Sequence, residues 1–153
     1  PGYKYNMFDI QAAMGLRQMD KLQAMQDRRK EIVNAYEEAF SKYEQLITPK
    51  AASYTEHSWH LYVLQLNLDK LSIDRDKFIE LMAEANIGTS VHFIPVHLMS
   101  YYKNNYGYKE GDFPVAEAYF ERIVSLPLYP KMSDKDVNDV ISAVVNIVTK
   151  NRK

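Results

Sequence analysis

Four histidines are the side chains best suited to acid–base or metal chemistry in this sequence. They form two pairs, His57 with His60 and His92 with His97. Histidines three residues apart bind one metal ion when they share a helix face, but His57 and His60 stand beside Trp59, just ahead of a predicted strand. We therefore expect no metal site. His92 lies near the end of another predicted strand, where it is either a packed residue or part of a pocket.

The first residues of the sequence bring together an ammonium, an amide and phenol rings. Lys4, Tyr5 and Asn6 come just before a helix that is predicted to begin near Asp9. Donors of this kind at a helix start are suited to binding a phosphate. The same residues also fit a surface turn whose tyrosines pack over the helix start. Nothing near Lys4 supplies the burial or the neighbouring cation that activates a Schiff-base lysine.

The composition is that of one soluble globular domain. The chain has 153 residues, 19 of them basic and 20 acidic, and a net charge of -1. This balance provides no general field for attracting nucleic acid. No apolar run approaches the roughly 20 residues that cross a bilayer, and we expect no secretory signal. The absence of cysteine excludes thiolate chemistry and fits a cytoplasmic location.

The elements that position these residues begin with a long helix. Residues 9–43 contain no proline, and from Leu22 onward apolar residues recur every three or four positions. A helix of this length would extend about 50 Å and needs a partner surface. Gly15 is the place where we expect it to bend or to meet another backbone closely.

A strand, a helix and a second strand are predicted next. Alternation of apolar and polar residues over residues 62–68 predicts the first strand. Ser72 or Asp74 can cap a helix that ends at Asn86 and Gly88. Residues 89–94 are rich in β-branched and aromatic side chains and predict a second strand that stops at a proline.

The last third of the chain predicts a surface loop, two helices and a short extended segment. Residues 101–111 read as an ordered loop, and a helix is expected from Pro114 to Ile123. Two prolines make residues 126–130 extended. Ser133 then begins a capping-box helix with one apolar stripe. The whole pattern predicts an α+β domain: a long helix and a small sheet covered by helices.

Four segments of the sequence resemble the DegT/DnrJ/StrS-type sugar aminotransferases, in the order and spacing of that family. The most specific is GYKYNMFDIQAAMGLRQMDKL, residues 2–22. The others are HSWHLYVLQL at 57–66, ANIGTSVHFIPVHLMSYY at 85–102 and ERIVSLPLYPKMSDKDVNDVISAV at 121–144. Together they cover nearly the whole chain. The variants at 4–6 and 57–60 look most like the branch that aminates UDP-4-keto-pentoses for lipid A modification.

The resemblance implies the C-terminal small domain of a fold-type I, aspartate aminotransferase-like enzyme, comprising residues 1–153. Such enzymes use pyridoxal 5'-phosphate and move an amino group, usually from glutamate, to a nucleotide-linked keto sugar for cell-surface polysaccharide or lipopolysaccharide. They are homodimers whose active sites lie at the subunit interface. The lysine that forms the aldimine lies upstream of residue 1 in the family. We therefore expect this chain to contain no catalytic residue of its own and to be inactive alone.

The resemblance also suggests roles for individual residues. Asn6 and Lys4 match the segment that reaches the neighbouring subunit's cofactor phosphate, although the amide and the cation have exchanged places relative to the commonest form. His92 matches a position near the sugar nucleotide, and His97 and Tyr5 are further substrate-side candidates. The family also contains sugar 3-dehydratases, in which a histidine replaces the upstream lysine. That reaction and a non-catalytic binding or regulatory domain are the alternatives.

Overall fold

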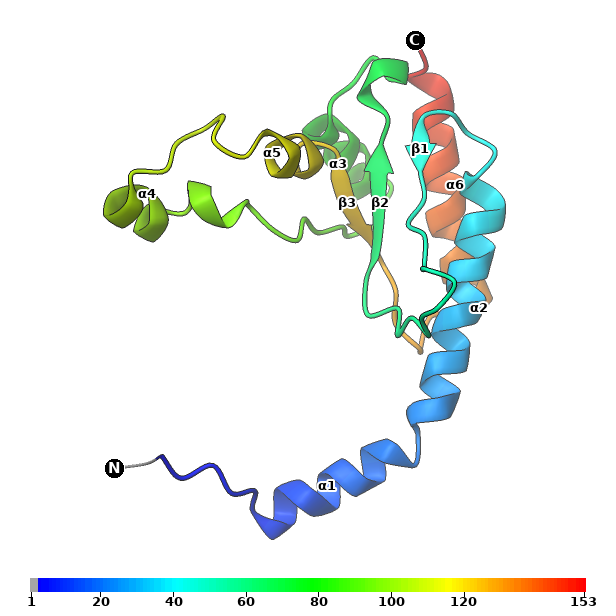
Figure 1. Cartoon of the computed structure of the whole chain (residues 1–153). Helices are drawn as coiled ribbons and strands as arrows, with labels where there is room; N and C mark the ends of the chain where they lie inside the picture. The colour runs from blue at the N-terminus through cyan, green and yellow to red at the C-terminus, as the bar shows by residue number, and fades with distance from the viewer. Residues whose placement is uncertain (1–2) are drawn as a thin grey trace.

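The computed structural model describes residues 3–153 as a small sheet packed against helices, from which two arms extend. The strands are β1 (Leu46–Ile47), β2 (Tyr62–Leu66) and β3 (Ile123–Leu126). The helices are α1 (Asp9–Met19), α2 (Leu22–Phe40), α3 (Arg75–Glu84), α4 (Ser100–Tyr106), α5 (Pro114–Phe120) and α6 (Asp134–Lys150), with 3₁₀ turns η1 (Leu68–Lys70) and η2 (Val96–Leu98). The predicted α+β class is confirmed. The arm with α1 and the arm with α4 project to the same side, giving an open, C-shaped outline (Figure 1).

Alternation along β2 decides which face of the sheet the helices cover. The even-numbered residues of β2 are fully buried in a core shared with α2, α3 and α6, whereas Val63 and Gln65 are half-buried on the opposite face. The sheet is antiparallel, in the order β1-β2-β3, with Leu46 opposite Leu66 and Val63 opposite Ser125. The predicted strand is confirmed but ends at Leu66, two residues early.

The second strand, predicted at residues 89–94, is wrong in extent. In that range only Ser90 pairs with the sheet, through an isolated bridge to Ser125. The third strand is β3, which begins at Ile123, the last residue of the helix predicted from Pro114. All four residues of β3 are buried and paired with β2. Tertiary pairing therefore ends α5 at Phe120, where the local pattern would continue a helix.

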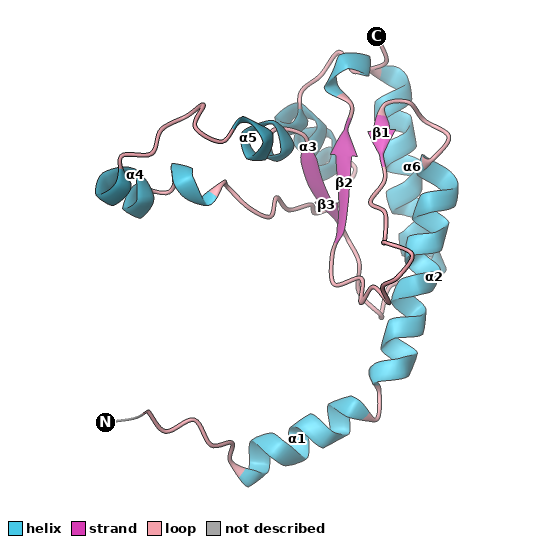
Figure 2. Cartoon of the chain, in the orientation of Figure 1, coloured by secondary structure: helices cyan, strands magenta, loops and turns pink. Residues whose placement is uncertain are grey.

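The long helix predicted from residue 9 is two helices. α1 and α2 meet at a bend over Asp20 and Lys21, as Figure 2 shows, and Gly15 lies within α1. A side chain added at Gly15 would meet nothing within 4 Å, so no close backbone approach requires that glycine. The two helices differ in burial: α2 packs Ile32 and Tyr36 into the core, while α1 buries no residue.

The two remaining core helices begin at the caps that the sequence predicts. The Asp74 carboxylate accepts a hydrogen bond from the Lys77 backbone N–H (2.8 Å) at the start of α3. After α3, Asn86 adopts a left-handed backbone with φ 61°, which ends the helix. Ser133 and Asp136 form the capping box of α6, whose apolar stripe packs on α2 and α3.

The segment predicted as a surface loop, residues 101–111, contains a helix. α4 covers its first half and ends at Gly107, whose φ of 71° is left-handed. Aromatic rings stack in series along this arm, with Tyr102 and Tyr106 centroids 6.0 Å apart and Tyr106 and Tyr108 also 6.0 Å apart. Ring packing within the arm supplies the contacts that a solvated loop would lack.

Candidate functional site

Lys4, Tyr5 and Asn6 lie in the irregular segment ahead of α1, near the tip of the N-terminal arm (Figure 1). Tyr5 is 87% exposed, and its ring centroid lies 5.9 Å from that of Tyr3. Within residues 3–153, neither the Lys4 ammonium nor the Asn6 amide has a side-chain hydrogen bond or an ion pair. The tyrosines therefore do not pack over the helix start, and the polar groups are available to a ligand or to another chain.

The donors of this segment fit a phosphate group. Lys4 offers a cation and Asn6 an amide N–H, and charge-assisted hydrogen bonds to phosphate are among the stronger ones. At the helix start itself, the Phe8 N–H already donates to Gln11 Oε1 (3.2 Å), and Asp9 places a carboxylate in the first turn. Lys4 and Asn6 are therefore the side-chain donors that this segment could offer to a phosphate, whereas the Asp9 carboxylate would repel it.

α1 carries exposed apolar side chains on two sides. Ile10 and Met14 are 76% and 64% exposed, and Leu16 and Met19 are 69% and 63% exposed. Successive residues of a helix turn by about 100°, so the first pair and the second pair point in roughly opposite directions. A helix that is apolar on opposite sides is normally buried. α1 therefore needs to be covered from both sides.

His92 lies beside β3, on the face of the sheet that the core helices leave uncovered. Its Nδ1 is 2.9 Å from the Ser125 hydroxyl, and its ring meets that of Phe93 edge-on at 4.7 Å. The imidazole is half-buried, and its Nε2 makes no hydrogen bond within the described part of the chain. His92 is therefore oriented through one nitrogen and has the other available.

His97, on η2, is held inside the α4 arm. Its Nε2 donates to Glu117 Oε1 (2.8 Å), and its ring lies 4.7 Å from that of Phe113. The Glu117 carboxylate also accepts the backbone N–H groups of Gly111 and Phe113. The Gly111 N–H bonds, together with His97 and Phe113, hold the pKa of Glu117 below its usual value of 4.5. His97 is buried, and it borders an apolar hollow of about 270 Å³ that Tyr102 and Tyr108 also line.

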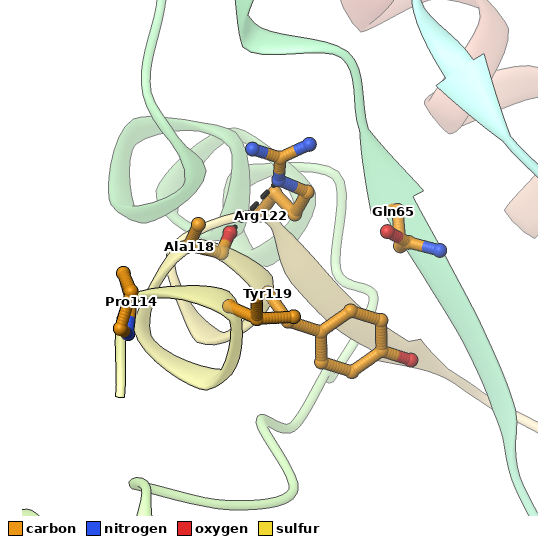
Figure 3. Close-up of a pocket in the computed structure, with 6 residues that line it drawn as sticks. Gln65, Pro114, Ala118, Tyr119 and Arg122 are labelled. Atoms are coloured by element: carbon orange, nitrogen blue, oxygen red, sulfur yellow. Dashed lines mark hydrogen bonds between the residues drawn. The ribbon is translucent and has the colours of Figure 1, made fainter. Parts of the chain in front are cut away.

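A second hollow, of about 400 Å³, opens between α5 and β2 (Figure 3). Arg122 and Gln65 lie on two sides of it, and Tyr119 projects from α5 along the sheet. The Nε of Arg122 donates to the Ala118 carbonyl (2.8 Å), which fixes the plane of the guanidinium. Sequence reasoning did not single out Arg122 or Ser125, because neither lies in a chemical motif; only the sheet register reveals their neighbours.

The group of His57, Trp59 and His60 is partly held by ring packing. No cluster of three potential ligands exists among residues 3–153. The His57 and Trp59 rings are 4.1 Å apart, and Trp59 packs against the hydrophobic core. This is the packing role expected of a large tryptophan surface. Across the same described range, no helix is both long enough and apolar enough to traverse a bilayer.

Residues 1–145 match the model of the DegT/DnrJ/EryC1/StrS aminotransferase family. The chain belongs to this family. Among curated members, it is 56% identical over 149 residues to the spore coat polysaccharide biosynthesis protein SpsC of Bacillus subtilis. It is 55% identical over 151 residues to the uncharacterized protein MJ1066 of Methanocaldococcus jannaschii. The family resemblance of the four sequence segments is thus confirmed.

A solved family structure has the same fold. The PLP-form of the putative sugar aminotransferase Spr1654 from Streptococcus pneumoniae matches with a TM-score of 0.87 and 34% identity, covering 98% of this chain and 38% of that one. The match to SpsC covers 97% of this chain and 38% of SpsC. The match to MJ1066 covers 99% of this chain and 39% of MJ1066. It therefore spans a little over a third of the length of the family members that it matches.

Proposed function

We propose that this chain forms the C-terminal domain of a pyridoxal-phosphate-dependent aminotransferase that moves an amino group from glutamate to a nucleotide-linked keto sugar. The observation that carries the proposal is the exposed segment from Lys4 to Asn6. Its polar side chains have no hydrogen-bond partner among residues 3–153, and the chain matches the aminotransferase family. The names of SpsC and Spr1654 support a surface polysaccharide as the destination and pyridoxal phosphate as the cofactor.

Lys4 and Asn6 are the residues that would hold the cofactor phosphate. Their cation and amide suit its charge and its acceptor oxygens. When bound, pyridoxal phosphate serves as the electron sink of the reaction. No lysine of this chain is proposed to bond covalently to the cofactor; that residue belongs to the part of the enzyme that these residues do not span.

Tyr5, His92 and His97 are proposed as the substrate-side residues. Tyr5 presents an exposed phenol next to the phosphate ligands. His92 can bind a sugar hydroxyl or a diphosphate oxygen through its available Nε2. His97 contributes differently: it is committed to Glu117, so it would act by shaping the hollow of the α4 arm.

We also propose that the enzyme works as a homodimer in which the N-terminal arm reaches the second subunit. The two apolar sides of α1 support this, because one surface can cover only one of them. The rest of the same polypeptide would cover one side and the second copy the other. Lys4 and Asn6 would then lie at the subunit interface.

The reaction is tested with the full-length protein, glutamate and a panel of nucleotide-linked keto sugars. We expect formation of 2-oxoglutarate that depends on the keto sugar, with an amino sugar identified by mass spectrometry. A deoxygenated keto sugar formed without any amino sugar would assign the enzyme to the dehydratases instead. If neither glutamate nor any keto sugar of the panel is consumed, the proposal is contradicted.

The phosphate ligands are tested by replacing Lys4→Ala together with Asn6→Ala in the full-length protein. Because two donors to the phosphate are lost, we expect the purified variant to retain less cofactor, measured by absorbance and by release in denaturant. The matched control is Asn34→Ala with Lys42→Ala, an exposed amide and an exposed cation on and just after α2. Equal cofactor occupancy in the two double variants would remove Lys4 and Asn6 from the site.

A further inference from the structure

We propose that Ser125 is a positioning residue that holds the His92 imidazole by Nδ1 and directs Nε2 toward the keto-sugar substrate. The inference rests on the proposed function, because it names the residue that orients a proposed substrate ligand. It stands on the geometry of β3 and its edge, where the Ser125 hydroxyl lies 2.9 Å from His92 Nδ1.

The place of Ser125 in the sheet fixes its hydroxyl. Its backbone is paired on both sides, with Val63 of β2 and with Ser90, whose carbonyl accepts the Ser125 N–H at 2.7 Å. Val124 and Leu126 belong to the core that the helices share, so alternation turns Ser125 to the opposite face. The strand and its two neighbours thus hold the hydroxyl beneath His92.

Ser125 is a buried polar group with one side-chain partner. The residue is only 5% exposed, and within residues 3–153 its hydroxyl bonds only to His92. A buried hydroxyl requires a partner, and a half-buried imidazole gains one fixed orientation from it. Phe93 restrains the same ring from its edge. A serine that served only to fill the sheet face would not need to meet an imidazole nitrogen.

Because the partner of Nδ1 is a hydroxyl, the second nitrogen of His92 can act either as a donor or as an acceptor of a hydrogen bond. A serine hydroxyl can donate to Nδ1 or accept from it, so both neutral tautomers of the ring are satisfied. His97 shows the contrast, because an ionised carboxylate only accepts and Glu117 restricts His97 Nε2 to donating. His92 Nε2 can therefore donate to a diphosphate oxygen or accept from a sugar hydroxyl without turning the ring.

The test uses the full-length protein and separates the two half-reactions. We expect Ser125→Ala to raise the KM for the keto sugar by about fivefold to tenfold, the usual effect of one hydrogen bond, while the glutamate half-reaction changes less than about twofold. Ser125→Thr keeps a hydroxyl and should restore most of the affinity. The control is Ser90→Ala, which removes the neighbouring exposed hydroxyl and leaves the backbone bridge in place.

A double-mutant cycle with His92→Ala distinguishes positioning from packing. If Ser125 acts through His92, the double variant is no worse for the keto sugar than His92→Ala alone. Additive losses, or a Ser125→Ala variant that behaves like Ser90→Ala, would overturn the inference. If the full-length protein transfers no amino group, the proposed function is wrong, but the contact can still be tested. The ¹⁵N NMR signals of the His92 ring report whether Nδ1 changes in Ser125→Ala, and an unchanged Nδ1 signal would overturn the inference.

Discussion

The two histidines of residues 92–97 differ in the chemistry of their partners. His92 meets the hydroxyl of Ser125, 33 residues along the chain, and His97 meets the carboxylate of Glu117, 20 residues along. The family resemblance implied that both lie on the substrate side. Their partners come from other elements, so the sequence could not distinguish an adaptable imidazole from one restricted to a single hydrogen-bonding role.

Glu117 contributes stability to the α4 arm that depends on its charge. Its pKa is lowered by the Gly111 N–H bonds and by His97, so its contribution is complete above its usual value of 4.5 and is lost as the pH falls through the lowered pKa. We expect Glu117→Gln to lower the thermal midpoint at about pH 7. The difference from the unmodified protein should shrink below pH 4.5, as both side chains become neutral.

The matched control for this substitution is Glu110→Gln, an exposed carboxylate in the same arm with no hydrogen bond among the described residues. Hydrogen exchange locates the effect, since the Gly111 and Phe113 amides bond to Glu117. Faster exchange of both amides in Glu117→Gln alone is the expected result. Unchanged protection would mean that the rings of the arm, and not this carboxylate, hold its shape.

At the scale of elements, the features encoded by neighbouring residues were predictable and those set by distant ones were not. The caps at Asp74 and Ser133 are local and are present as expected. The bend at Asp20 has no such local signal, because neither proline nor glycine stands at residues 20–21; the two helices differ instead in burial. Residues 89–94 have strand composition, yet only Ser90 finds a partner.

The capping box of α6 provides a measurable contribution to that element. The Asp136 N–H donates to Ser133 Oγ (3.2 Å), and the Ser133 N–H donates to Asp136 Oδ2 (2.8 Å). We expect Ser133→Ala to reduce the free energy of unfolding by about 1 kcal/mol in urea titrations, whereas Ser133→Asp should retain most of it. A loss as large in Ser133→Asp as in Ser133→Ala would mean that the hydroxyl stabilises the protein by another contact.

At the scale of the whole molecule, the open outline leaves the segment with Lys4, Tyr5 and Asn6 exposed on an arm that extends from the sheet. The N-terminal arm and the α4 arm extend from the sheet to the same side (Figure 1). The two curated relatives are more than twice as long as this chain, so under the proposed function the rest of such an enzyme is long enough to occupy that side. The segment resemblance indicated such a context, whereas periodicity and composition indicated only one globular domain.

The two apolar sides of α1 yield a prediction about assembly. One pair of substitutions, Ile10→Glu with Met14→Glu, places charge on one side, and Leu16→Glu with Met19→Glu places it on the other. If the second subunit covers one side and the rest of the same polypeptide the other, one double variant should sediment as a monomer. The other should remain a dimer with a lower thermal midpoint, because an uncompensated charge is then buried within the subunit.

Gln18→Glu, which adds a single charge at an exposed polar position of α1, controls for charge alone. Two double variants that both stay dimeric would show that α1 is covered within one polypeptide and that the subunit interface lies elsewhere.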